Sequence, residues 1–406
     1  MKQAKQRVIA IDYFRGLFIL APVMNHAMLF SMPFAYLTGA GRLWTSAAEL
    51  LMIISGLTFG IVRGEQIKSG FAAVYKKTLR RVGQIYMVNI LVVVLSLLLA
   101  LITTSHHLTN DVDGVLPTRT GLSLLWSILN LSYSIGWGGF LGLFAVFLAG
   151  APTALYVLRT KGWLMVPIGS AALYIASIKS PAAFGPYAVF AMWQLYFVMG
   201  MVLAKLRLPV LMGYGKLSSL YRRTITYGAI GIAAILLGVC ILFEDNNIIY
   251  HRVAHLSAAG WLPTKLIIGY QHLLVYKPTL DHLLMSSREG FLRPLFALVV
   301  LGGMYAAFQL YKDFWLAKTG RTMITLGKNT LMVFAAQAIA IPLLAILPLQ
   351  RSIANNTLLT GTLLLTVWAV TQRKQILQRS RNYGLELTKS FSEAKYAAMY
   401  GQEDSA

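Results

Sequence analysis

The first apolar stretch of the sequence contains three ionisable residues, Asp12, Arg15 and His26. Such side chains are costly inside a membrane span, so they indicate function there. Arg15 and His26 are eleven residues apart, which on a helix places them on one face with about 16 Å between them along the axis. The cation could hold phosphate groups, and the imidazole could take and release a proton deeper in the span. The alternatives are an arginine that only anchors the helix and a histidine bonded within the bundle.

A second apolar stretch begins with a carboxylate, Glu49, and carries a small pair, Ser55 and Gly56, deeper in. Glu49 could orient His26 or assist it as a base, because a catalytic base is commonly held by a third group. However, the helix dipole also favours an acidic residue at a helix start. Ser55 and Gly56 could simply allow two helices to pack closely. The sequence leaves both interpretations open.

The segment before the third apolar stretch is strongly basic and is followed by a tyrosine. The residues concerned are Lys76, Lys77, Arg80, Arg81 and Tyr86. Arginines grip phosphates through paired hydrogen bonds. With Arg15, this segment could bind the phosphates of CoA, whose extended pantetheine arm would carry a thioester to His26. Basic flanks are also ordinary in the cytoplasmic segments of membrane proteins.

Membrane helices must position these residues. The chain has 406 residues, of which 57% are hydrophobic and 12% charged, whereas about a quarter of the residues of a soluble domain are charged. The sequence predicts an all-α, polytopic transmembrane bundle of about ten helices: one membrane domain (residues 1–373) and a polar cytoplasmic tail (374–406). The ten runs of spanning length are Tyr13–Met32, Ser46–Val62, Val82–Ile102, Gly138–Leu158, Trp163–Ile178, Ala188–Ala204, Thr226–Phe243, Phe291–Leu310, Met323–Leu347 and Ala354–Thr371.

The distribution of charge favours ten spans with both termini in the cytoplasm. With this topology, 27 of the 36 Lys and Arg residues lie on the inner side, as the positive-inside rule requires. The net charge of +22 therefore reflects topology, and no nucleic-acid partner is expected. An eleventh apolar run, Leu122–Tyr133, would invert everything after it, so we predict an interfacial or re-entrant helix there. The first stretch resembles a signal peptide but lacks a convincing cleavage site, so we expect a retained helix.

Two segments on the predicted outer side, Thr103–Gly121 and Glu244–Gly290, are long enough to cover a site. The second contains His251 and His255, whose spacing on a helix could suit zinc. No third ligand follows at a fixed spacing, so neither a metal nor a bound cofactor is expected. Cys240 is the single cysteine of the chain and is expected to be a packing residue.

Several motifs are spread along the chain. The first helix combines Arg15 with the pair Asn25 and His26, the second ends its motif at Ser55 and Gly56, and the third is entered through Arg80 and Arg81. Three later segments carry further motifs: Trp193–Gly200, Tyr276–Leu280 and Leu326–Phe334. Together these residues resemble the acyltransferase-3 superfamily of membrane proteins, and most closely its OpgC-type branch.

The resemblance implies a ten-helix bundle in the bacterial inner membrane, acyl-CoA as cytoplasmic co-substrate, and an extracytoplasmic glycan acceptor such as a periplasmic glucan. The transferred group would be succinyl or acetyl. His26 would be catalytic with Arg15 in support, and Glu49 would assist His26 as argued above from its position. The further pocket residues would be Asp12, Asn25, Ser55, Tyr86, Trp193, Gln194 and Lys277. The chain departs from those relatives that place a histidine after the late Val-Phe pair, since it has Ala335, Ala336 and Gln337 there.

The alternative function is a transporter or flippase of a glycan or a lipid-linked glycan. In that case Asp12, Arg15, His26 and Glu49 would line a substrate or proton path. The sequence shows no pair of Gly- or Pro-interrupted helices in matching halves, which disfavours this interpretation. Motifs of serine hydrolases, P-loop NTPases and dinucleotide-binding enzymes are also absent from the sequence.

Overall fold

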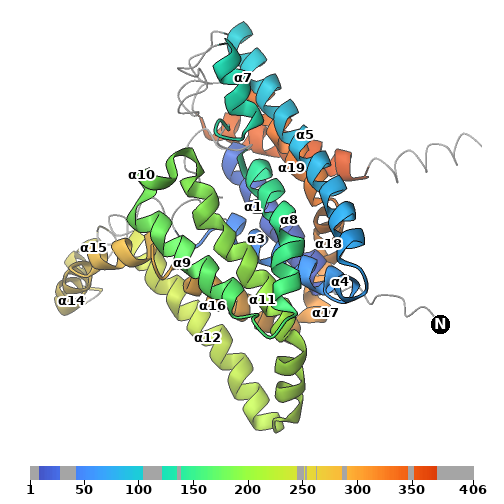
Figure 1. Cartoon of the computed structure of the whole chain (residues 1–406). Coiled ribbons are helices and arrows are strands. Elements are labelled where there is room, and N and C mark those ends of the chain that lie inside the picture. Colours follow the sequence, from blue (N-terminus) through green and yellow to red (C-terminus); the bar gives the residue numbers. More distant parts are fainter. Residues whose placement is uncertain are drawn as a thin grey trace, which may run out of the picture.

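The computed structural model describes residues 9–27, 43–103, 121–134, 139–244, 251, 254–261, 263–285, 290–345 and 352–372, and every element in these ranges is helical (Figure 1). The predicted all-α class is therefore confirmed. The polar tail 374–406, most of Thr103–Gly121 and the ends of several predicted spans lie outside the described residues.

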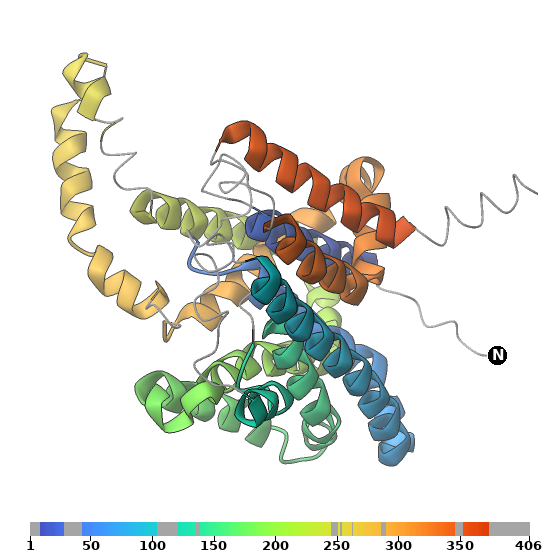
Figure 2. The same cartoon turned by 90° about the horizontal axis from the view of Figure 1, so that it is seen from above.

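The helices form a bundle with α1 and α3 at its centre (Figures 1 and 2). α3 packs along α11, α1 packs against α3 and α18, and α5 packs against α8 and α19. The bounds of these central helices are α1 Ile9–Ala27, α3 Ala47–Arg63, α5 Phe71–Thr103, α8 Gly139–Leu158, α11 Ala188–Lys216, α18 Arg321–Lys328 and α19 Thr330–Ala345. The residues that matter for function are thus carried by helices that contact one another directly.

The remaining helices surround or connect this centre. α12 packs against α16, and α9 packs against α11. Their bounds are α4 Gln66–Ser69, α7 Gly121–Leu129, α9 Met165–Lys179, α10 Pro181–Phe184, η1 Gly185–Tyr187, α12 Ser219–Glu244, α14 Thr264–Leu274, α15 Lys277–Leu280, η2 Asp281–Met285, α16 Arg293–Leu310, α17 Lys312–Trp315 and η3 Leu316–Gly320. The last described helix spans Ile353–Gln372.

Two central helices approach so closely that glycine is required at the contact. A Cβ on Gly56 of α3 would collide with the carbonyl oxygen of Phe197 on α11, and one on Gly200 of α11 would collide with that of Ile53. Small residues allow this approach in membrane bundles. The packing interpretation of the Ser55 and Gly56 pair is therefore confirmed for Gly56.

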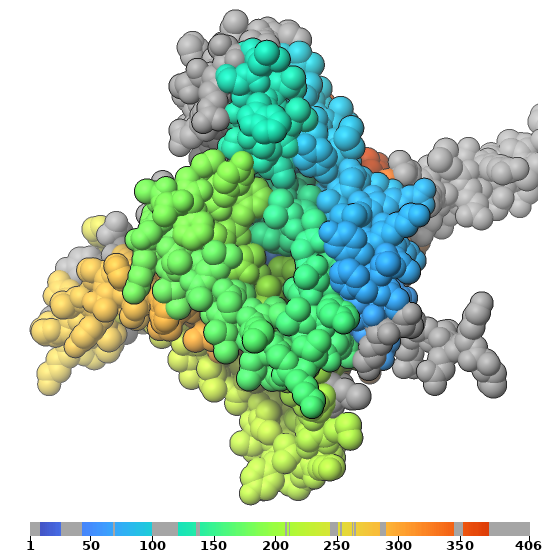
Figure 3. Space-filling view, in the orientation of Figure 1, coloured from blue at the N-terminus to red at the C-terminus, as the bar shows by residue number. Residues whose placement is uncertain are grey.

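Several of the predicted spans are too short, and α5 and α11 differ most. α5 begins at Phe71 and not at Val82, and α11 continues to Lys216 beyond the predicted end at Ala204. With 33 residues, α5 is about 50 Å long, whereas the hydrocarbon core needs about 30 Å. The extra turns carry charged residues, namely Lys76, Lys77, Arg80 and Arg81 in α5 and Lys205, Arg207 and Lys216 in α11, so a search for long apolar runs does not reveal them. At its far end α11 joins α12 in a hairpin that projects from the bundle (Figures 1 and 3).

The predicted span Met323–Leu347 is not one straight helix. Lys312–Lys328 and Thr330–Leu344 meet at an angle of 81°. The break falls at Asn329, whose amide donates to the Thr325 carbonyl oxygen at 2.9 Å. α18 lies across α1, and α19 then turns to run beside α1 and α5.

Six of the described helices are long and apolar enough to cross a membrane, or seven if the bent pair is one span. The protein is therefore a membrane protein by the composition of its helices, whereas the count of ten spans and the cytoplasmic position of both termini stay predictions. α7 has nine residues, or about 14 Å, so it is too short to cross. This agrees with excluding Leu122–Tyr133 from the spans.

Candidate functional site

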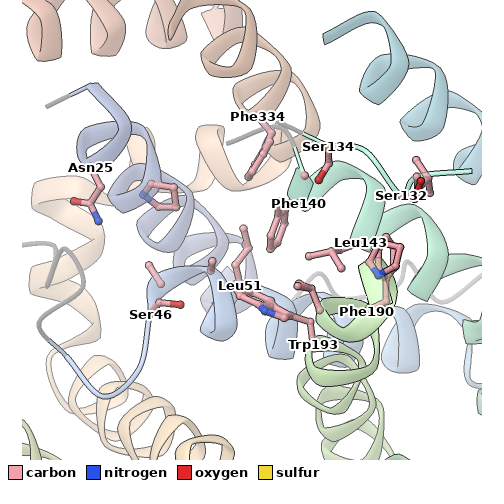
Figure 4. A pocket seen from close by; sticks show the side chains of 17 residues that line it. Asn25, Ser46, Leu51, Ser132, Ser134, Phe140, Leu143, Phe190, Trp193 and Phe334 are labelled. Carbon is pink, nitrogen blue, oxygen red and sulfur yellow. The ribbon is translucent and has the colours of Figure 1, made fainter. Parts of the chain in front are cut away.

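A cavity of about 390 Å³ lies where the ends of several helices meet. Its volume is in the range of small-molecule sites. Figure 4 shows Asn25 and Ser46 on one side of the cavity and Ser134 and Phe140 on the other. The lining comes from the end of α1 (Pro22, Asn25), the start of α3 (Ser46, Ala47, Ala48), the segment after α7 (Leu131, Ser132, Ser134), the start of α8 (Gly139, Phe140), the start of α11 (Val189, Phe190, Trp193) and α19 (Phe334). These are the helix ends that the predicted topology assigns to the outer side.

The predicted site residues of α1 lie at different positions relative to this cavity. Asn25 lines the cavity, and His26 is the next residue of the same helix. The side chain of His26 lies outside the described residues. Arg15 is half-buried about three turns earlier, and Asp12 is buried beside Gly327 of α18. The expected separation of Arg15 and His26 along one helix is therefore present in the backbone.

The start of α3 is held by a capping box. The hydroxyl of Ser46 accepts from the Glu49 N–H at 3.3 Å, and the Glu49 carboxylate accepts from the Ser46 N–H at 3.0 Å. The Thr45 hydroxyl donates to the same oxygen of Glu49 at 2.9 Å. Reciprocal bonds of this kind fix the entry of a helix. They fix here the residues Ser46, Ala47 and Ala48 that line the cavity.

Glu49 also forms an ion pair that the sequence did not reveal. Its side chain is fully buried, and its second oxygen accepts from both Nε and an Nη of Arg293, each at 2.7 Å. Both carboxylate oxygens therefore have strong donors. Arg293 is the first residue of α16, 244 positions further along the chain. Glu49 is thus a residue that positions α3, and its predicted contact with His26 stays a prediction.

Aromatic rings form much of the cavity wall. The Phe140 ring stacks on Phe334 with centroids 4.9 Å apart and meets Trp193 edge to face at 6.1 Å. Beside them, Ser132 and Ser134 flank Tyr133, and burial raises the pKa of the Tyr133 phenol. The cavity therefore combines apolar faces with neutral hydroxyl groups.

The predicted phosphate-binding residues lie on one helix near its start. Lys76, Lys77, Arg80 and Arg81 are all exposed on α5. The guanidinium of Arg81 donates to Gln84 at 3.2 Å. None of these four residues lines the cavity. The basic segment is thus part of α5 and accessible to a ligand, whereas the sequence predicted that it lies just before the start of that helix.

The other predicted pocket residues are spread over the bundle. The Ser55 hydroxyl donates to the Leu51 carbonyl oxygen at 2.7 Å, and the Tyr86 hydroxyl donates to the Leu129 carbonyl oxygen, which fastens α7 to α5. Trp193 lines the cavity.

Gln194 and Lys277 do not line this cavity. The Gln194 amide exchanges hydrogen bonds with the hydroxyl and carbonyl of Ser170, which joins α11 to α9. Lys277 pairs with Asp281 at 3.2 Å in the predicted outer segment. Within the described residues, that segment forms helices α14, α15 and η2, which extend from the side of the bundle (Figure 2). The described residues contain no group of three or more His, Cys, Asp or Glu that could hold a metal ion.

Comparison with known proteins places the chain in a family. No curated protein and no solved structure matches it. A family model described as OpgC protein matches residues 7–378, which include every described helix from α1 to the last one. The match covers the cavity, the basic part of α5 and the ion pair of Glu49. The chain therefore belongs to the OpgC family, which makes it a membrane enzyme of the acyltransferase type.

Proposed function

We propose that the protein is an O-acyltransferase of a bacterial inner membrane that moves succinyl or acetyl from cytoplasmic acyl-CoA to a hydroxyl of an extracytoplasmic glycan, such as a periplasmic glucan. The observation that carries this proposal is the cavity at the end of α1, lined by Asn25, the neighbour of His26. Family membership supports the acyltransferase class.

The proposed donor site begins at the basic part of α5. Four exposed cations, Lys76, Lys77, Arg80 and Arg81, occupy two consecutive turns there, and CoA carries several phosphate groups that such cations bind. Arg15 of α1 adds a half-buried cation. From these phosphates, the pantetheine arm would extend along the helices and bring the thioester to His26.

The proposed acceptor site is the cavity itself. Sugar rings have apolar faces and hydroxyl edges, which match the rings of Phe140 and Trp193 and the hydroxyls of Ser132 and Ser134. The volume of about 390 Å³ suits one or two sugar units of a glycan. The cavity would thus hold a hydroxyl beside the end of α1.

The proposed reaction needs one base. His26 takes the proton of the acceptor hydroxyl, whose oxygen attacks the thioester carbonyl carbon. The C–S bond of the resulting tetrahedral intermediate breaks, the new ester is released, and the CoA thiolate takes the proton back from His26. A two-step route would need a nucleophile. The candidates are His26 and Ser55, and the Ser55 hydroxyl is already bonded to the Leu51 carbonyl oxygen on the same helix. We propose direct transfer, which needs His26 only as a base.

Replacing the proposed base tests this function. Purified protein is mixed with succinyl-CoA or acetyl-CoA and a glucan oligosaccharide; released thiol and ester product are measured. We expect His26→Ala to lose about 100-fold or more of the transfer rate, the usual contribution of a general base. His272→Ala, at an exposed position of α14, is the matched control and should retain the wild-type rate.

The transporter alternative predicts another result. If wild-type protein moves glycan across vesicles while no thioester is consumed, the enzymatic function is wrong. If His26→Ala retains full transfer, the enzyme class stands but the base is another residue.

A further inference from the structure

Two buried carboxamides within the bundle have no hydrogen-bond partner among the described residues. Asn89 of α5 is 1% exposed, Gln337 of α19 is 0% exposed, and neither the oxygen nor the nitrogen of either amide is bonded. Burying an amide without a partner is strongly unfavourable. Trp44 and Ser96 each leave one buried polar atom without a partner among the described residues, whereas Asn89 and Gln337 leave both polar atoms of a side-chain amide unused, which indicates a polar ligand.

Both amides lie directly behind the wall of the cavity. The Asn89 amide is 3.7 Å from the position that a Cβ on Gly142 would take, and the side chain of Leu131, a lining residue, is 3.5 Å from the same position. Gln337 is one helical turn beyond Phe334, whose ring stacks on Phe140. α5 packs against both α8 and α19. Asn89 therefore lies near the lining residue Leu131, and Gln337 lies one turn beyond the lining residue Phe334.

We propose that Asn89 and Gln337 bind the two amide groups of the pantetheine arm of the donor, an inference that rests on the proposed use of acyl-CoA. A carboxamide offers an N–H donor and a carbonyl acceptor, which are complementary to the carbonyl and N–H of each amide in the arm. Apolar walls with two carboxamide side chains would therefore suit the pantetheine arm, which carries no charge.

The spacing along the helices fits this ligand. Asn89 is eight residues beyond Arg81 on α5, or about 12 Å along the axis, and Gln337 is seven residues from the start of α19, or about 10 Å. The arm has roughly the length of four extended residues, about 14 Å. Phosphates held at Arg81 would therefore place the amides of the arm level with Asn89 and the thioester slightly beyond it, toward the cavity.

Binding measurements on the purified full-length protein test this inference. The probes are CoA and 3′-phosphoadenosine 5′-diphosphate, which carries phosphates but lacks the arm. Asn89→Leu and Gln337→Met should each weaken CoA binding about tenfold, the effect of one lost hydrogen bond in a buried site, and leave the binding of the shorter probe unchanged. Their unfolding temperatures should equal or exceed that of the wild type, because an unbonded buried amide is replaced by an apolar group.

Ser96→Ala is the matched control, since Ser96 is a second buried polar residue of α5 whose hydroxyl has no partner among the described residues. It lies about 10 Å further along the helix and should leave both affinities unchanged. Wild-type affinity for CoA in both amide variants would overturn the inference and indicate trapped water at these sites. Equal weakening of both probes would overturn it too. If the wild type binds neither probe, the proposed donor is wrong, and the inference fails with it.

Discussion

Arg293 is the residue whose importance becomes visible only in three dimensions. It neutralises a carboxylate that is fully buried, and that carboxylate in turn holds Ser46 and Thr45 at the start of α3. Removing one partner of a buried pair leaves an uncompensated charge. Arg293 therefore stabilises the cavity wall through Glu49 without lining the cavity.

This relation predicts an unequal response to single and double substitutions. Arg293→Met should cost about 3–5 kcal/mol of unfolding free energy, because the Glu49 charge loses its partner. Adding Glu49→Gln should recover most of this loss, since glutamine is neutral and still serves in a capping box. Unfolding of the three proteins in one detergent measures the difference. A double variant that is as unstable as Arg293→Met would show that the pair does not act through charge.

At the residue scale, Asn25 and Trp193 belong to the motifs that carry the family resemblance, and both line the cavity. Glu49 was identified as a carboxylate at the start of a span, but its burial and its partner Arg293 were missed. A lone arginine at the start of an apolar run is also an ordinary flanking residue, and a contact 244 residues away leaves no local pattern. Nothing in the sequence around Gln194 indicates that its side-chain amide bonds to α9.

At the scale of elements, the contact between α3 and α11 depends on two glycines that face the opposite backbone. Gly56 and Gly200 have no room for a Cβ, because carbonyl oxygens occupy that space. Backbone atoms cannot move aside as a flexible side chain can, so the helices would have to separate. Since α3 and α11 both contribute to the cavity, separation would widen the proposed acceptor site.

A glycine pair provides a test of this packing. Gly56→Ala should lower the unfolding temperature by several degrees and reduce transfer, because overpacking costs about 1–3 kcal/mol. Gly231→Ala on α12, where nothing lies within 4 Å of the new Cβ, is the matched control and should be neutral or slightly stabilising. Equal effects of both substitutions would show that close packing is not the cause.

The centres of the helices could be predicted and several of their ends could not. Apolar runs locate the part of each helix inside the hydrocarbon, as for Gly139–Leu158 of α8, whose predicted bounds differ by one residue. They do not locate the polar turns that extend α5 to Phe71. The bend at Asn329 lies inside the predicted span Met323–Leu347, in the short polar stretch Gly327–Thr330. Glycine and asparagine favour a helix end, but the apolar pattern of the whole span concealed this signal.

At the scale of the whole molecule, the two proposed substrates meet the bundle at different ends. The exposed cations of α5 lie in its first third, whereas the cavity is formed by the end of α1 and the starts of α3, α8 and α11. The positive-inside rule assigns the first group to the cytoplasm and the second to the outer side. The central claim is therefore that the acyl group crosses the membrane within this one chain.

Transfer in sealed vesicles tests this claim most directly. The protein is reconstituted with glucan oligosaccharide trapped inside and succinyl-CoA or acetyl-CoA added only outside, with His26→Ala vesicles as the background. We predict acylated glucan inside the intact vesicles, made by the molecules whose basic end faces outward. When both substrates are outside, we predict no product until detergent opens the vesicles. Rapid acylation with both substrates outside intact vesicles would contradict the account, because both sites would then face the same side.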